Sequence, residues 1–460
     1  MRQHARSAPG RLTVTLTLTI ALALALVCAG RAHANGRLPG SSQIAFHPTD
    51  NDVIVARVTF GLVVSGDGGR TWGWICEPPL MIRDGEDPAV LVMGDGAILA
   101  TTTRGVVRGA NGGCDWSYPD PALEGFYIVD STGMAGVPSR AFVVSSAASR
   151  PNSPWRSDDN GMSWVPLGTP LDGVFFETID TAPSDPLRLY MTGAIPPTST
   201  APRMPAVYSS NNGGTSFDRH PFTLGTGEQN IYLAGVDPAN ADRIFVRVLS
   251  PDGMDRLVVS DDAGQTVHDV LALTEMLGFA RSPDGATVWA GGPDDGLWRS
   301  TDRGETFVRI SDVRVGCLAA REGELWACGN DFRDLFAVGR STNGGDSFEP
   351  MLTFERLDGV LECPAGSPVA AMCPALWPDL QALLGIMPDA GAPALDAGSS
   401  APDAGADAGL EPAAASSDCG CRVSGARAGA SWTGPVLALL AATLLGWRTR
   451  RPRRGHAVRR

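Results

Sequence analysis

Seven short segments of the chain place a carboxyl or amide side chain at a fixed position, and these residues are the first candidates for chemistry. A full copy reads Ser-x-Asp-x-Gly-x-Thr/Ser-aromatic, as in SGDGGRTW at 65–72. A carboxylate in such a repeat could bind a metal ion or act as a general acid. The repeated positions are Asp67, Asn111, Asp159, Asn212, Asp262, Asp302 and Asn343.

The neighbours of these side chains indicate a structural role instead. An Asp or Asn oxygen can accept hydrogen bonds from backbone N–H groups a few residues further on, which closes a tight turn. Glycine permits a positive φ there, and the closing Trp, Phe or Val can enter an apolar layer. We therefore predict anchored hairpin turns. We expect no metal and no cofactor, since no Cys-x-x-Cys pair is present and histidines are few.

The turns recur with the period of a four-stranded unit. Their first residues stand 44, 48, 53, 50, 40 and 41 positions apart, which fits one propeller blade per repeat. Short runs rich in β-branched and aromatic residues, such as 52–58 and 242–248, indicate strands. We expect an all-β fold, a seven-bladed β-propeller of four-stranded blades, over residues 35–360.

The repeated segments resemble the Asp-box (BNR) repeats of sialidases, sortilin-type receptors and photosystem II assembly propellers. The resemblance covers about residues 40–358. It implies that each segment connects the third and fourth strands of a blade, remote from any ligand site. Irregular loops are expected on the opposite face, where binding usually resides. These loops are 146–155, 192–206 and 329–337.

Three arginines are the candidates for ligand binding on that opposite face. Arg57 and Arg247 occupy the same position on the predicted second strands of two blades, and Arg104 is expected on the same rim. The forked donors of arginine match carboxylate or sulfate, which predicts a site for an acidic ligand. The alternative is that these arginines pair with nearby Asp or Glu.

Composition excludes several classes of function. The chain has no lysine, so its 37 basic residues are all arginine, which rules out a phosphate-binding Walker lysine and a Schiff-base lysine. Residues 35–418 hold 24 arginines and all 50 acidic residues, a net charge near −26. Such a field repels nucleic acid and anionic lipid.

The first 34 residues have the features of a secretory signal. A basic stretch, an apolar core at 20–27 and the motif Ala32-His33-Ala34 follow one another. We expect signal peptidase to remove 1–34 and the protein to leave the cytoplasm.

The sequence changes character after the last repeat. Residues 361–387 include a short helical pattern at 375–387, which we expect to cap the ring. The segment 388–418 repeats Asp-Ala-Gly and has too few apolar residues to form a core, so we predict a disordered linker.

Residues 419–460 combine a Cys419-Gly420-Cys421 motif, an uncharged stretch at 428–447 and an arginine-rich end. Twenty uncharged residues are long enough to span a bilayer core as a transmembrane helix, and the arginines should stay cytoplasmic. This order resembles the MYXO-CTERM sorting signal. The resemblance implies cleavage by a C-terminal sorting protease near Cys419 and Cys421, and display at the cell surface. An uncleaved single-span membrane anchor is the alternative.

Six cysteines remain between the signal and the tail, an even number that predicts disulfides in an exported chain. Six cysteines allow fifteen pairings, and we expect neighbours along the chain to pair. The expected pairs are Cys76 with Cys114, Cys317 with Cys328, and Cys363 with Cys373.

These features favour a non-catalytic surface propeller that binds a protein, peptide or glycan. An envelope assembly scaffold is the nearest alternative. A sialidase-like glycosidase is less favoured, because only Arg37-Leu38-Pro39 resembles the sialidase motif that precedes the first repeat, and its aromatic residue is missing.

Overall fold

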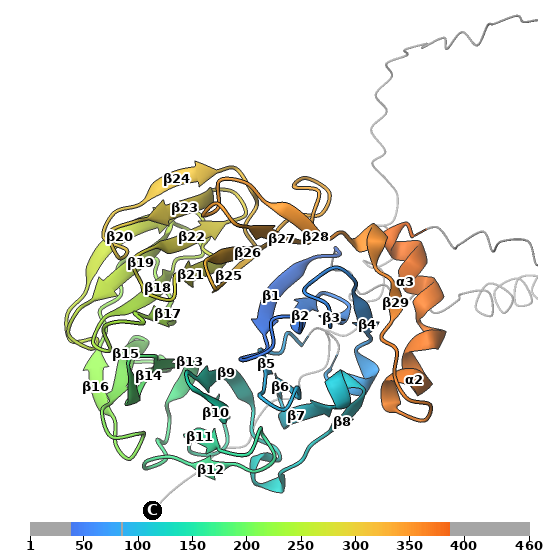
Figure 1. The fold of residues 1–460 in the computed structure, drawn as a ribbon. Helices are drawn as coiled ribbons and strands as arrows, with labels where there is room; N and C mark the ends of the chain where they lie inside the picture. Colours follow the sequence, from blue (N-terminus) through green and yellow to red (C-terminus); the bar gives the residue numbers. More distant parts are fainter. Residues whose placement is uncertain (1–37, 84–85, 387–460) are drawn as a thin grey trace, which may run out of the picture. The chain divides into compact units, whose positions relative to one another are not determined.

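The computed structural model describes residues 38–83 and 86–386, which form seven β-sheets arranged as a ring (Figure 1). Each sheet contains four consecutive antiparallel strands in chain order, so the predicted seven-bladed, four-stranded propeller is confirmed. The expected secretory signal, linker, membrane span and sorting motif lie outside the described residues. Among the described residues, no helix combines the length and apolar character that crossing a membrane requires.

The first four blades span residues 41–221. Blade 1 has β1 Ser41–Phe46, β2 Ile54–Val58, β3 Gly61–Ser65 and β4 Gly73–Ile75. Blade 2 has β5 Val90–Val92, β6 Ile98–Thr102, β7 Gly105–Ala110 and β8 Asp115–Ser117. Blade 3 has β9 Ile128–Met134, β10 Val137–Ser145, β11 Pro154–Ser157 and β12 Val165–Pro166. Blade 4 has β13 Phe175–Ala182, β14 Asp185–Ile195, β15 Met204–Ser210 and β16 Asp218–Pro221.

The remaining blades and the helices complete the chain. Blade 5 has β17 Asn230–Val236, β18 Ile244–Leu249, β19 Asp255–Ser260 and β20 His268–Leu273. Blade 6 has β21 Gly278–Arg281, β22 Val288–Gly292, β23 Gly296–Ser300 and β24 Val308–Ser311. Blade 7 has β25 Cys317–Arg321, β26 Glu324–Cys328, β27 Val338–Ser341 and β28 Glu349–Leu352. A last strand, β29 Gly359–Val360, precedes α2 Pro368–Met372 and α3 Trp377–Leu384. Short 3-10 helices are η1 Pro78–Leu80, η2 Asn111–Gly113, η3 Pro121–Leu123, η4 Phe354–Arg356 and η5 Cys373–Ala375.

The alternating strand directions give the ring two different faces. All seven repeated segments connect the third strand of a blade to its fourth, as predicted, so they lie on one face together with the turns between first and second strands. We call this the turn face. The connections between second and third strands, and between successive blades, lie on the opposite face, which we call the loop face.

The repeated turns are closed by side-chain hydrogen bonds, as the turn at 300–307 illustrates. Ser300 Oγ donates to Asp302 Oδ1 at 2.6 Å and accepts from Gly304 N at 2.8 Å. Asp302 also accepts from the backbone and the hydroxyl of Thr306. Five other turns share this pattern. The second copy has Gly109 in place of the serine, and there Asn111 Nδ2 donates to Asp115 Oδ2.

Glycine is required in these turns for two reasons, which Gly304 shows. Its φ is +85°, and a Cβ atom built on it would lie 2.4 Å from Cε1 of Phe245 in the preceding blade. Side chains larger than glycine are excluded by the backbone conformation and by this contact. The turn therefore also acts as a contact between neighbouring blades.

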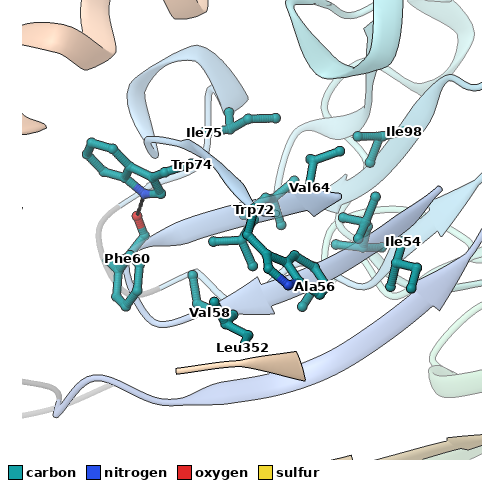
Figure 2. Close-up of a cluster of buried hydrophobic side chains, with 14 of the residues drawn as sticks. Ile54, Ala56, Val58, Phe60, Val64, Trp72, Trp74, Ile75, Ile98 and Leu352 are labelled. Atoms are coloured by element: carbon teal, nitrogen blue, oxygen red, sulfur yellow. Dashed lines mark hydrogen bonds between the residues drawn. The ribbon is translucent and has the colours of Figure 1, made fainter. Parts of the chain in front are cut away.

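The residue that ends each turn fills the space between blades to different extents. Trp72 is 2% exposed, and its Nε1 donates to carbonyl oxygens of Gly69 and of Met351 in blade 7. Figure 2 shows Trp72 within the apolar cluster of Ile54, Val64 and Leu352. Val267 is 40% exposed, so the prediction that every such residue enters the apolar layer is wrong at this turn, where the side chain is too short to reach the layer.

The ring is closed by the C-terminal segment 353–386, which we call the strap. The strap follows β28 and adds β29 to blade 1, parallel to β4 (Figure 1). Disulfides join Cys76 to Cys373 and Cys114 to Cys363, so the strap is linked to blades 1 and 2. Two of the three predicted pairings are therefore wrong, because ring closure brings together cysteines 297 and 249 residues apart. The pairing of Cys317 with Cys328 is confirmed.

Candidate binding site

A cavity of about 890 Å³ lies on the loop face between blades 4 and 5. Its rim comes from two irregular segments: the connection from β14 to β15, and the connection at 221–230 from β16 to β17. The first of these falls within the loop 192–206 that the sequence singles out. Apolar walls are provided by Pro197, Pro202, Met204, Pro205, Pro221, Phe222, Leu224 and Leu249.

A carboxylate and an amide from adjacent inner strands meet in this cavity. Asn230, the first residue of β17, donates from Nδ2 to Oε1 of Glu177 on β13 at 2.6 Å. The same oxygen lies 3.5 Å from Nη1 of Arg203, a contact that forms an ion pair but no hydrogen bond. Within the described residues no hydrogen bond reaches the second oxygen, Oε2.

The side-chain amide oxygen of Asn230 accepts no hydrogen bond from the described residues. The residue is 4% exposed, and its Oδ1 has no hydrogen-bond partner among the described residues. Its orientation is fixed, because a carboxylate can only accept and so must face the amide nitrogen. A buried polar atom without a partner costs free energy unless a ligand or water satisfies it.

A second carboxylate of the cavity is fully paired. Glu228 accepts from Arg256 Nε at 2.6 Å and from Gly225 N at 2.5 Å. The hydrogen bond from Arg256 holds the pKa of Glu228 below its usual value. Glu228 therefore stabilises the 221–230 connection and is unsuited to donate a proton at neutral pH.

Tyr232 connects this cavity to a second one of about 420 Å³, which is lined by the inner strands β1, β17 and β25. Burial raises the pKa of Tyr232, and the charge of Glu177 raises it further. The guanidinium of Arg247 lies over the Tyr232 ring, 5.9 Å from its centroid. Tyr232 therefore lines both cavities.

The three predicted arginines lie at the expected strand ends but line different cavities. Arg247 lines the second cavity and pairs with the buried Asp255, at 2.6 Å from Nη2 to Oδ2. Arg57 donates to Ser42 Oγ and to the carbonyls of Asp87 and Pro88. Arg104 donates to the carbonyl of Met81 and lies over the Tyr118 ring. Arg247 thus makes the ion pair that the sequence analysis gave as the alternative.

The inner strands of blades 3, 4 and 6 contribute a second group of charges. Asp130 on β9 accepts from the backbone of Ile179, and Asp180 on β13 lies 3.7 Å from Arg281 on β21. The inner strands of the blades enclose the central channel of the ring, and the side chain of Asp130 on β9 is half-buried. Burial raises its pKa to about 7, and the charge of Asp180 adds to this.

Sequence reasoning missed Glu177, Asn230 and Tyr232. They sit in strands of ordinary composition, and no local motif marks them. The only indication of a site in this region was the unusual length of the neighbouring loop 192–206. Among the described residues no group of three or more His, Cys, Asp or Glu could hold a metal ion.

Solved structures of other proteins share the fold. An ancestral GH74 enzyme aligns with 68% of this chain at 14% identity and a TM-score of 0.51. The GH74 xyloglucanase from Xanthomonas campestris aligns with 71% at 14% identity and a TM-score of 0.46. YCF48 bound to D1 peptide aligns over 64% of this chain and 89% of its own, at 17% identity and a TM-score of 0.43.

The present chain covers 46% of the ancestral GH74 enzyme and 61% of the xyloglucanase, less than two thirds of either. No family profile and no curated protein matches the sequence. At these identities the likeness extends to the fold alone. The chain is a seven-bladed β-propeller of four-stranded blades, with GH74 enzymes and YCF48 among its structural neighbours.

Proposed function

We propose that this protein is an exported, surface-displayed propeller that binds a protein or peptide ligand, without catalysis, in the cavity between blades 4 and 5. The observation that carries the proposal is the cavity itself, about 890 Å³ on the irregular loop face; its lining includes Asn230, whose buried amide oxygen has no partner among the described residues. Concave sites with apolar walls and a few convergent polar groups are typical of ligand binding.

Export is supported by the three disulfides, which indicate an extracellular or envelope compartment. In this proposal the repeated turns are Asp-box repeats, residues 1–34 are a secretory signal, and 419–460 hold a MYXO-CTERM-type sorting signal. Arg57, Arg104 and Arg247 remain predicted ligand contacts elsewhere on the loop face, and Arg247 lines the adjoining cavity, where it pairs with Asp255.

The pairing of the charged groups supports the non-catalytic part of the proposal. A glycosidase needs one carboxyl that is protonated near neutral pH and a second carboxylate close to it. In the cavity, Arg256 lowers the pKa of Glu228. The channel pair Asp130 and Asp180 is the place to test the enzymatic alternative, because the pKa of Asp130 is raised to about 7. Release of reducing sugar from xyloglucan that is lost in Asp130→Asn would establish that alternative.

The proposal can be tested by blocking the cavity. Thr223 is exposed on the cavity rim, so Thr223→Trp should fill the cavity without disturbing the core. The matched control is Thr215→Trp, an exposed threonine in a repeated turn of blade 4. Extracellular and envelope proteins captured by the native chain should be lost with Thr223→Trp and kept with Thr215→Trp. Equal capture by both variants would contradict a site in this cavity.

A further inference from the structure

We propose that the cavity between blades 4 and 5 receives a cationic side chain, an arginine or lysine of a protein ligand, and that Arg203 competes for the same position. This inference rests on the proposed function, because it names the chemistry of the ligand at that site. Four features of the site carry it: the acceptors on the cavity lining, the loose ion pair of Arg203, the rings beside Glu177, and the charge of the chain.

Two acceptor oxygens of residues that line the cavity have no hydrogen-bond donor among the described residues. Asn230 Oδ1 is buried and unpartnered, and Glu177 Oε2 accepts no hydrogen bond from the described residues. Both oxygens belong to side chains joined by the 2.6 Å bond from Asn230 Nδ2 to Glu177 Oε1. Two acceptors held together in this way suit a group with several N–H donors, such as guanidinium or ammonium.

The ion pair of Arg203 with Glu177 is loose enough to be displaced. The contact is 3.5 Å long without a hydrogen bond, and the Arg203 side chain is 34% exposed on the β14–β15 connection. Glu177 is 23% exposed and therefore more strongly desolvated than its partner. By contrast, Arg256 binds Glu228 at 2.6 Å with a hydrogen bond, as expected of a permanent structural pair.

The charge of Glu177 acts on two neighbouring tyrosine rings, and at Tyr232 it is opposed by Arg203 and Arg247. Glu177 contributes to the raised pKa of Tyr232, and also to that of Tyr127, where burial and Glu86 contribute more. Aromatic faces beside a carboxylate favour a cation. Arg203 and Arg219 are the opposing charges on the lining; Arg203 is held only by its loose ion pair, and Arg219 is exposed at the rim and screened by solvent.

Long-range electrostatics act in the same direction. The segment 35–418 carries a net charge near −26, so the protein attracts cationic partners from solution and repels acidic ones. A ligand that presents an arginine or lysine therefore meets favourable charge at a distance, and in the cavity it can pair with Glu177 once Arg203 is displaced.

The test measures how removing a negative or a positive charge from the cavity changes the affinity for one peptide probe. The probe is a fluorescein-labelled pentapeptide with one arginine between glycines, and its neutral counterpart carries citrulline. Binding to the full-length chain is measured by fluorescence anisotropy at low ionic strength. We expect the arginine peptide to bind and the citrulline peptide to bind at least about tenfold more weakly, since bonds to charged groups are the stronger ones.

Two variants should shift this affinity in opposite directions. Glu177→Gln should weaken binding of the arginine peptide about tenfold or more. Arg203→Gln should strengthen it about two- to fivefold, because it removes an exposed competing ion pair. The matched controls, Arg299→Gln and Asp346→Asn, break a 3.0 Å ion pair on the turn face and should leave affinity unchanged. Arg203 lies in an exposed loop, so this variant should fold normally even if Glu177→Gln does not.

Several results would overturn the inference. Binding of a peptide with a central glutamate, weakened by Arg203→Gln, would assign the cavity to acidic ligands. Binding of the neutral oligosaccharide cellotetraose, unaffected by Glu177→Gln, would assign it to glycans. No binding of any probe would also reject the cationic ligand. In each case, continued loss of captured partner in Thr223→Trp would leave the proposed function standing.

Discussion

The turn face and the loop face are built from the same strands but follow different rules. On the turn face, the serine, the Asp or Asn and the glycine recur in almost identical hydrogen-bonded turns. On the loop face, the connection at 195–204 differs in length and composition from its counterparts, and it borders the cavity of about 890 Å³. Repetition marks the residues that hold neighbouring blades together, and irregularity marks the part of the ring that is free to bind.

The contrast extends to the protonation of the carboxyl groups. Hydrogen bonds from Ser300 and Thr306 hold the pKa of Asp302 at about 2 on the turn face. In the channel, burial raises the pKa of Asp130 to about 7. The turns therefore stabilise the charged form of aspartate, whereas the channel stabilises the neutral form.

The largest expected effect is a difference in stability loss between a variant of a buried turn residue and a variant of a cavity residue. Trp72→Ala leaves a void between blades 1 and 7 and should lower the free energy of unfolding by about 3–5 kcal/mol. Phe222→Ala, at the partly exposed cavity wall, should cost less than half as much but weaken ligand binding. Urea denaturation of both variants measures this difference. Similar losses of stability would break the distinction between the two faces.

Removal of a disulfide that holds the strap should have the next largest effect on stability. Cys76→Ser with Cys373→Ser removes a link between residues 297 apart, and we expect a loss of about 2–4 kcal/mol, because the unfolded chain regains conformational freedom. Thermal unfolding with and without reductant checks this value. If the native protein melts at the same temperature in both conditions, the strap does not stabilise the ring.

The channel carboxyl should give a smaller effect that depends on pH. Because the folded-state pKa of Asp130 is raised, its stabilising contribution is present below pH 4 and is lost as the pH rises through about 7. Asp130→Asn should therefore stabilise the protein by about 1–3 kcal/mol at pH 8 and have little effect at pH 4. Melting curves at the two pH values provide the measurement. Destabilisation at pH 8 would mean that the charged carboxylate is needed there.

The turn aspartates should give the smallest effect, with the opposite sign. Their lowered pKa means that their contribution is present above the unfolded-state value of about 3.8 and is lost as the pH falls toward 2. Asp302→Asn should flatten this acid-induced decrease slightly and change little at pH 7, because asparagine already occupies the same position in Asn212 and Asn343. A steep loss of stability at pH 7 would show that the carboxylate has a further role.

The repeated features, the blades and their turns, could be predicted from the sequence. The features formed by residues far apart in the chain, the disulfides of the strap and the cavity, could not. The seven spaced copies of the segment around Asp67 were enough to predict the number of blades and the position of each turn. The pairing of Cys114 with Cys363 depends on where the strap crosses the closed ring, and no local spacing records that path. Glu177 and Asn230 meet only because blades 4 and 5 pack side by side, so each residue alone carries no signal.

The central claim is that ligands bind on the loop face in the cavity between blades 4 and 5. Its most direct test places a photo-crosslinking amino acid at Phe222 in the cavity wall, or at the exposed Val267 on the turn face, in cells that make the full chain. The account predicts that the Phe222 position crosslinks to a defined partner and that the Val267 position does not. Crosslinks formed only from Val267, or equally from both positions, would contradict it.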